Sequence, residues 1–115
     1  MLIVPLPHKV QELEVNGKRP FQQWLKKLKN AEASAAILAR IRRIEIVGNF
    51  GSYRYLNDGV FELKFSINPG YRVYFGLQHG NIVLLLAGGD KSSQARDIKK
   101  AIELWKEYLA SLTDL

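Results

Sequence analysis

The chain contains no cysteine in its 115 residues. This absence excludes disulfide bonds, zinc sites built on thiolates and catalysis by a thiol nucleophile, and it is compatible with a reducing compartment. Histidine is almost absent as well, with His8 and His79 as the only imidazoles. We therefore do not expect a ribonuclease that uses two histidines as acid and base, and we place His79 in a turn before Gly80.

Long apolar runs are also missing. No segment approaches the roughly 18 consecutive apolar residues of a membrane span. The N-terminal MLIVPLP contains two prolines and no preceding basic region, unlike a signal peptide. We expect a soluble, cytoplasmic protein with no membrane partner, folded as a single domain over residues 1–115, because 47% of the residues are hydrophobic.

Acidic residues are in the minority. Seventeen Lys and Arg stand against eleven Asp and Glu, which gives a formal net charge of +6. This excess favours a polyanionic partner or an acidic protein, although a solvated surface gives the same composition. The carboxylates Glu62, Asp90 and Asp97 are too few and too mixed with cations to indicate a metal site, so we expect no cofactor. Asp90 is expected instead to cap or orient the segment of Lys91.

Three segments have apolar residues at helical spacing. A short helix begins at Pro20, and a second over residues 31–46 ends before Gly48, so the two are predicted to form an αα-hairpin. A last helix is predicted to begin at Ser92 or Ser93. The predicted inward residues are Phe21, Trp24, Leu25 and Leu28; Ile37, Leu38, Ile41 and Ile44; and Ile98, Ile102, Trp105, Leu109 and Leu112.

Four other segments are predicted strands. They cover about residues 9–15, which end at an Asn-Gly turn signal, and residues 60–67, 71–77 and 82–87. The last is continuously apolar, as a strand at the centre of a sheet would be. The order β-α-α-β-β-β-α implies an α+β domain, with its helices packed on one side of a mostly antiparallel sheet.

The two middle strands alternate apolar and polar residues, which predicts a hairpin with one polar face. A three-residue loop at 68–70 sets its register. The expected pairs are Ile67 with Tyr71, Ser66 with Arg72, and Lys64 with Tyr74. One exposed polar patch should then contain Lys64, Ser66, Arg72 and Tyr74.

A series of short motifs runs in order from about residue 9 to residue 108. They are Phe21 and Trp24; Ala39-Arg40-Ile41; Gly48-Asn49-Phe50-Gly51; Gly59-Val60 with Glu62-Leu63-Lys64; residues 68–75, NPGYRVYF; Gly88-Gly89-Asp90-Lys91-Ser92-Ser93-Gln94; and Asp97-Ile98 with Ala101. In the sequences and the order of these motifs, the chain resembles the RelE/ParE superfamily of bacterial toxins, in particular its HigB-like branch of addiction module killer proteins. Ordered matches over most of a chain are more specific than any single motif.

The resemblance implies a RelE-like fold and a type II toxin that a helix-turn-helix antitoxin neutralises in a hetero-oligomer. It further implies a metal-independent, ribosome-associated endoribonuclease that cleaves translated mRNA. The expected catalytic residues are Arg72, Lys64 and Lys91, because cations must neutralise the phosphorane and an arginine offers two parallel donors to phosphate. The expected RNA-binding residues are Tyr74, Ser66, Tyr53 and Arg54.

Alternatives stay open at each level. Arg72 could be a structural ion-pair partner of Glu62 or Asp90, Lys91 a solvated lysine at a helix start, and the tyrosines packing residues. Most relatives have arginine where this chain has Lys64, which weakens a phosphate-binding role at that position. The whole protein could instead be a non-catalytic DNA gyrase poison of the ParE kind, or an inactive relative that only binds an antitoxin.

Overall fold

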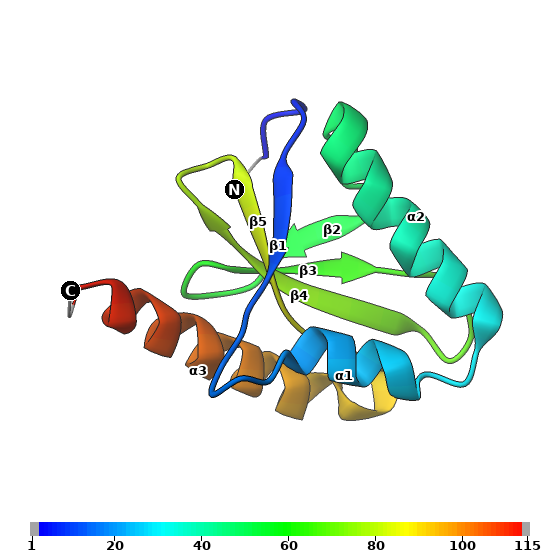
Figure 1. Ribbon diagram of the computed structural model, residues 1–115. Helices are drawn as coiled ribbons and strands as arrows, with labels where there is room; N and C mark the ends of the chain where they lie inside the picture. The colour runs from blue at the N-terminus through cyan, green and yellow to red at the C-terminus, as the bar shows by residue number, and fades with distance from the viewer. Residues whose placement is uncertain (1–2, 114–115) are drawn as a thin grey trace.

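The computed structural model describes residues 3–113, which form a five-stranded sheet with three helices (Figure 1). The elements are β1 (Lys9–Glu12), α1 (Pro20–Lys27), α2 (Ala31–Val47), β2 (Tyr53–Tyr55), β3 (Val60–Lys64), β4 (Tyr71–Gln78), β5 (Ile82–Asp90), a short 3₁₀ helix η1 (Lys91–Ser93) and α3 (Gln94–Thr113). The sheet order is β1-β5-β4-β3-β2. Only β1 pairs in parallel, with β5, so the predicted α+β class and mostly antiparallel sheet are confirmed, and the short strand β2 was missed.

Local sequence signals set the ends of the first two helices. Pro20 occupies the first turn of α1, where its missing N–H costs nothing. Asn30 caps α2 by accepting a 3.0 Å hydrogen bond from the Ala33 amide. Gly48 ends α2 in the left-handed conformation, with φ of 68°, which glycine adopts without strain. The predicted bounds of both helices are therefore confirmed to within a residue or two.

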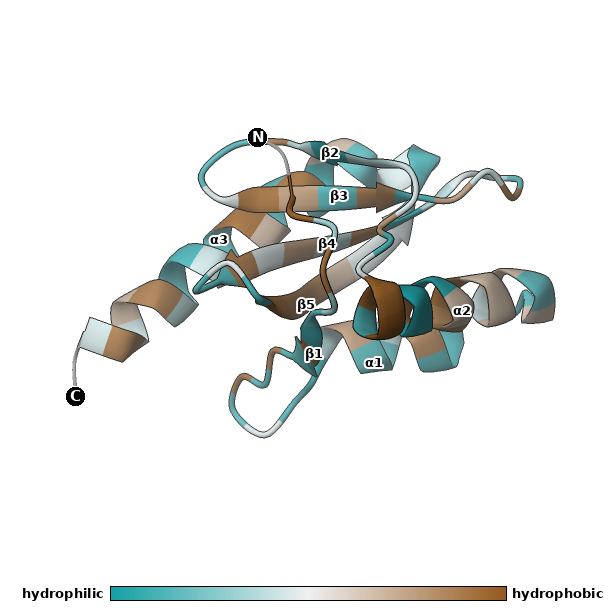
Figure 2. Cartoon of the chain, turned by 90° about the horizontal axis from the view of Figure 1, so that it is seen from above, coloured by the Kyte–Doolittle hydropathy of each residue, from teal (hydrophilic) through white to brown (hydrophobic). Residues whose placement is uncertain are grey.

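The helices cover both faces of the sheet, so the prediction that they pack on one side is wrong (Figure 2). Helices α1 and α2 bury Phe21 and Ile37 against one face, and α3 buries Trp105 against the other. Strand β4 is adapted to α3 at Gly76, where an added Cβ would collide with the ring of Trp105. Side chains of both parities along the central strands are thus buried.

The predicted αα-hairpin is also corrected. Helix α1 packs against β5 and α2 contacts β1, and Figure 1 shows α2 rising away from the end of α1. Leu38 was expected to face inward but is 54% exposed, because nothing in the described part of the chain covers that side of α2. At the far end of α3, Leu109 and Leu112 are exposed as well, since the helix extends past the sheet.

The β3–β4 register differs from the prediction by two residues. Lys64 pairs with Arg72 and Glu62 pairs with Tyr74, and the Phe65 amide donates a 3.0 Å hydrogen bond to the Tyr71 carbonyl. The connection is therefore a five-residue loop at 66–70. A two-residue shift keeps every side chain on its predicted face, so the hydrophobic pattern alone could not exclude it.

No helix within residues 3–113 is both long enough and apolar enough to cross a bilayer.

Candidate functional site

An open hollow of about 400 Å³ lies where β3 ends, β4 begins and η1 follows β5. We call it the basic hollow, because Lys64, Arg72 and Lys91 border it. Its full lining is Lys64, Phe65, Ser66, Ile67, Asn68, Pro69, Gly70, Arg72 and Lys91. The structure thus brings together all three predicted catalytic residues and one of the four predicted RNA-binding residues, Ser66.

The register explains why these side chains meet. Lys64 and Arg72 are direct cross-strand partners and so project from the same face. Strand β5 pairs with β4 so that Arg72 lies opposite Gly89, two residues before Lys91. Lys64, Ser66 and Lys91 are exposed, so a ligand in the hollow can reach them.

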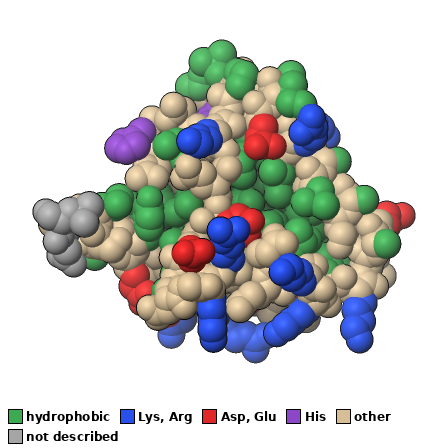
Figure 3. Space-filling view, viewed as in Figure 1, with side chains coloured by type: hydrophobic (Ala, Val, Ile, Leu, Met, Phe, Trp, Pro, Cys, Tyr) green, Lys and Arg blue, Asp and Glu red, His purple; other side chains and the backbone are tan. Residues whose placement is uncertain are grey.

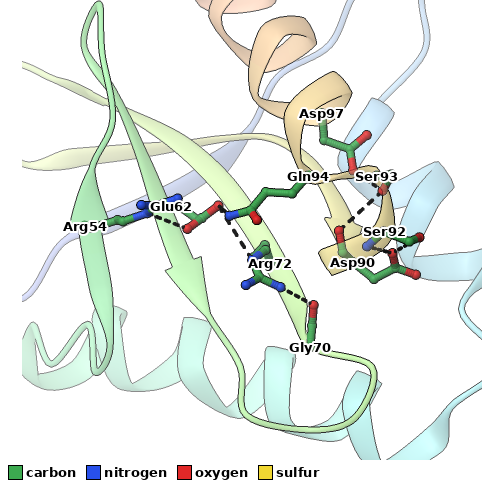
Figure 4. A network of polar contacts seen from close by, with 9 residues as sticks. All are labelled: Arg54, Glu62, Gly70, Arg72, Asp90, Ser92, Ser93, Gln94 and Asp97. Atoms are coloured by element: carbon green, nitrogen blue, oxygen red, sulfur yellow. Dashed lines mark hydrogen bonds and ion pairs between the residues drawn. The ribbon is translucent and has the colours of Figure 1, made fainter.

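Arg72 is buried, with only 6% of its surface exposed, so its predicted place on a solvent-facing strand surface is wrong. Its Nη1 donates a 2.6 Å hydrogen bond to the Gly70 carbonyl, and its Nε lies 3.8 Å from Oε2 of Glu62 (Figure 4). This ion pair matches the structural alternative weighed for Arg72. The same side chain still borders the basic hollow, so the two roles are compatible.

Glu62 is the centre of a polar network that the sequence analysis did not identify. It is 1% exposed and accepts hydrogen bonds from Arg54 Nε at 2.9 Å and from Gln94 Nε2 at 3.0 Å, besides the ion pair with Arg72 (Figure 4). Strand alternation places Glu62 on the polar face but does not show that the start of α3 covers it. Gln94, within the Gly-Gly-Asp-Lys-Ser-Ser-Gln motif, is the available signal.

Tyr74 is wrongly predicted as an RNA-binding residue. Its side chain is fully buried in the cluster under α3 that contains Trp105, so no base can stack on it. Its hydroxyl finds no hydrogen-bond partner among the described residues. Burial, followed by the nearby Glu62 carboxylate, raises the pKa of this phenol, which keeps it neutral.

The predicted contacts on β2 divide between the two faces of the sheet. Tyr53 packs with Phe50 and Phe61 in the core covered by α1 and α2, and its hydroxyl accepts a 3.1 Å hydrogen bond from the Ile3 amide. It therefore lies away from the basic hollow and is corrected to a packing residue. Arg54 pairs across the strands with Glu62, on the face of the hollow, and its side chain is 58% exposed.

Asp90 caps η1, as predicted. Its side chain accepts a 2.8 Å hydrogen bond from the Ser92 amide and one of 2.5 Å from the Ser92 hydroxyl. These hydrogen bonds lower the pKa of Asp90, the side-chain contact with Ser92 having the largest effect. The next turn is tied by a hydrogen bond from the Ser93 hydroxyl to Asp97. These hydrogen bonds fix the turn that carries Lys91 at the border of the basic hollow.

Arg40 supports the hollow from behind, a role that the sequence analysis missed. It reaches from α2 to donate a 3.1 Å hydrogen bond to the Lys64 carbonyl and a 3.2 Å one to the Phe50 carbonyl. Its guanidinium lies 4.3 Å from the centre of the Phe65 ring. Partial burial, and then the charge of Arg43, lower its pKa. The Ala39-Arg40-Ile41 motif was the only sequence signal.

The rest of the surface is basic along one edge. Figure 3 shows Lys and Arg side chains in a row beneath the region where Figure 1 places α1 and α3. Among residues 3–113, no three His, Asp or Glu side chains lie close enough together to hold a metal ion.

Comparison with known proteins gives one relative at high similarity. No family model matches the chain, and no solved structure matches it. An uncharacterized protein of Haemophilus influenzae is 48% identical over 95 residues, an alignment that spans 83% of this chain and 95% of that protein. Identity at this level over nearly the full length of the relative means that this chain belongs to the same family as the uncharacterized Haemophilus influenzae protein.

Proposed function

We propose that the protein is the toxin of a type II toxin-antitoxin system and acts as a metal-independent, ribosome-associated mRNA endoribonuclease. The observation that carries the proposal is the convergence of Lys64, Arg72 and Lys91 on one open hollow. The ordered motifs that resemble the RelE/ParE superfamily supply the toxin part of the proposal, because charge geometry alone does not identify a partner.

The hollow provides the positive charge that RNA cleavage without a metal requires. The 2′-hydroxyl loses its proton as its oxygen attacks the adjacent phosphorus, which forms a phosphorane with extra negative charge. The bond to the 5′-oxygen then breaks, this oxygen takes up a proton, and a 2′,3′-cyclic phosphate remains. Arg72 is fixed before substrate arrives, by Gly70 and Glu62, so little reorganisation is needed to stabilise that charge. Lys64 and Lys91 supply further donors to the phosphate, and the exposed Ser66 adds a neutral one.

An antitoxin is the expected protein partner. The chain has a net charge of +6, and an acidic antitoxin segment that covers the basic hollow would block RNA from it. Co-expression with the adjacent open reading frame, expected to encode a helix-turn-helix protein, should yield a stable 1:1 or 2:2 complex in a pull-down. If that pull-down recovers no complex, the toxin-antitoxin part of the proposal fails.

Lys64→Arg should increase RNA cleavage by about tenfold, equivalent to about 1.4 kcal/mol of transition-state stabilisation. Lysine offers a single charged group, whereas arginine offers a planar pair of donors that fits a phosphate. Because Lys64 is exposed at the end of β3, the longer side chain fits without repacking. The measurement is kcat/KM on ribosomes programmed with a defined mRNA, with the exposed Lys99→Arg as the matched control. Equal rates for both variants would remove Lys64 from the site.

A gyrase poison is the second candidate function, and the burial of Arg72 favours it. Arg72 is 6% exposed and paired with Glu62, so a contribution to stability is enough to explain its presence. A toxin that cleaves no RNA would use Arg72 in this way only. The same fact is compatible with an inactive relative that only binds an antitoxin. Growth arrest on induction separates the inactive relative from both toxins.

A further inference from the structure

Glu62 is the only fully buried carboxylate among residues 3–113. It lies in the middle of β3, between strands that each contribute an arginine, and the first turn of α3 covers it. An ionised carboxylate in such a position is stable only when charged or polar donors surround it. The donors around Glu62 therefore indicate its role in the protein.

Three elements supply those donors. Arg54 of β2 binds one carboxylate oxygen at 2.9 Å, and Gln94 of α3 binds the other at 3.0 Å. Arg72 of β4 approaches that second oxygen to 3.8 Å, and its Nε has no hydrogen-bond partner among the described residues. Figure 4 shows the two guanidiniums on either side of the Glu62 carboxylate. One acidic group thus holds two arginines.

The arrangement has more positive charge than an ion pair for stability alone would need. One arginine is enough to neutralise a buried carboxylate, and here a second arginine joins it while Lys64 and Lys91 border the same face. Two further carboxylates lie near Arg72, and both are already engaged. Asp90 accepts hydrogen bonds from Ser92. Asp97, which lies over Gly89 opposite Arg72, accepts one from the Ser93 hydroxyl. The excess positive charge faces the basic hollow and the exposed side of Arg54.

We propose that Glu62 is a positioning residue for the phosphate site: it orients Arg72 at the basic hollow and Arg54 beside it, and it does not touch the RNA. This inference rests on the proposed ribonuclease function. The cross-strand rows of Arg54 and Lys64 are two residues apart, about 7 Å along the sheet. Both side chains are exposed on the same face, Arg54 to 58%, so the positive charge continues from the basic hollow along the sheet.

Glu62→Gln tests the proposal through a kcat against KM comparison. Glutamine keeps the size and one acceptor oxygen, but it removes the charge that draws both arginines inward. We expect kcat for ribosome-bound mRNA to fall about 10- to 100-fold with KM little changed, because misplacing a group that acts in the transition state affects the chemical step. Glu103→Gln, an exposed carboxylate on α3, is the matched control and should retain wild-type kinetics.

A second measurement reads the position of the arginines directly. In protein labelled with ¹⁵N-arginine, the Nε–H of Arg54, which donates to Glu62, should exchange slowly with water in the wild type and rapidly in Glu62→Gln. The Nε–H chemical shift of Arg72, which lies beside the same carboxylate, should change as well. Circular dichroism and Tm establish that the variant is folded. If Glu62→Gln fails to fold, Gln94→Met is the second variant. It removes the neutral donor to Glu62, so the carboxylate is held less firmly, while Arg54 and Arg72 still compensate its charge.

The outcomes separate this inference from the proposed function. Loss of kcat together with rapid Nε–H exchange, in a folded variant, supports the positioning role. A folded Glu62→Gln or Gln94→Met variant with mobile arginine signals and wild-type kcat overturns it, as does a lowered Tm with unchanged kcat per folded molecule. If the wild-type protein cleaves no RNA on ribosomes, the proposed function itself has failed.

Discussion

Induction of the wild-type protein should fragment translated messages within minutes and stop protein synthesis before DNA synthesis slows. The expected fragments carry 5′-hydroxyl ends, because the 2′-oxygen is the nucleophile and the 5′-oxygen is the leaving group. Three cations at one hollow, Lys64, Arg72 and Lys91, are the physical basis for this expectation. The measurements are pulse labelling of protein and DNA synthesis, with mapping of RNA ends after induction.

The opposite pattern identifies the second candidate function. A gyrase poison should stop DNA synthesis first, provoke the DNA-damage response and leave messages intact. Intact mRNA with cleaved chromosomes would therefore overturn the ribonuclease proposal. Neither effect, in cells that make folded protein, would indicate a chain that has lost activity. A strain that also produces the antitoxin is the control, because neutralised toxin should give neither pattern.

Replacement of Arg72 should have the largest effect of any single substitution, on both activity and stability. Arg72→Ala should lower RNA cleavage by about 10²- to 10³-fold, since a fixed donor to the transition state is lost. It should also lower the free energy of unfolding by about 3 kcal/mol, because breaking a buried ion pair leaves Glu62 short of one partner. Arg54 and Gln94 still bind Glu62, which keeps the loss at the lower end for such pairs.

A double variant separates the two effects. Arg72→Met combined with Glu62→Gln removes both charges and keeps side chains of similar volume, so much of the stability should return. Cleavage should remain lower than in Glu62→Gln alone, because the phosphate donor is missing. Arg42→Ala, an exposed arginine on α2, should change neither property. A folded double variant that cleaves RNA and arrests growth as well as Glu62→Gln would exclude Arg72 from the site.

Much of the fold follows from patterns within short segments. Pro20 begins α1, where its missing N–H is not needed; Asn30 caps the first turn of α2; and Gly48 ends α2 in the left-handed conformation. None of these effects needs a partner from a distant segment. The alternation of β3 and β4 placed Lys64 and Arg72 on one face, since parity along a strand is a local property. The cap by Asp90 is equally local.

Predictions that depended on a distant segment were the ones that went wrong. The β3–β4 register was two residues off because both registers keep the apolar parity, and the contacts of the 66–70 loop decide between them. Leu38 looked like a core residue because its helical position is apolar. Whether another element covers that position is not encoded in α2 itself.

The local sequence by itself determined the helix ends and the faces of the strands, whereas the pairing of β3, β4 and β5 brought Lys64, Arg72 and Lys91 together. Only the tertiary structure decided that α3 covers the face opposite α1 and α2. An amphipathic stripe requires burial against some apolar surface but does not specify which one. Helix α3 covers the face that carries Glu62 and Tyr74. The polar face that was expected to be exposed therefore contains a buried carboxylate, with basic side chains around it.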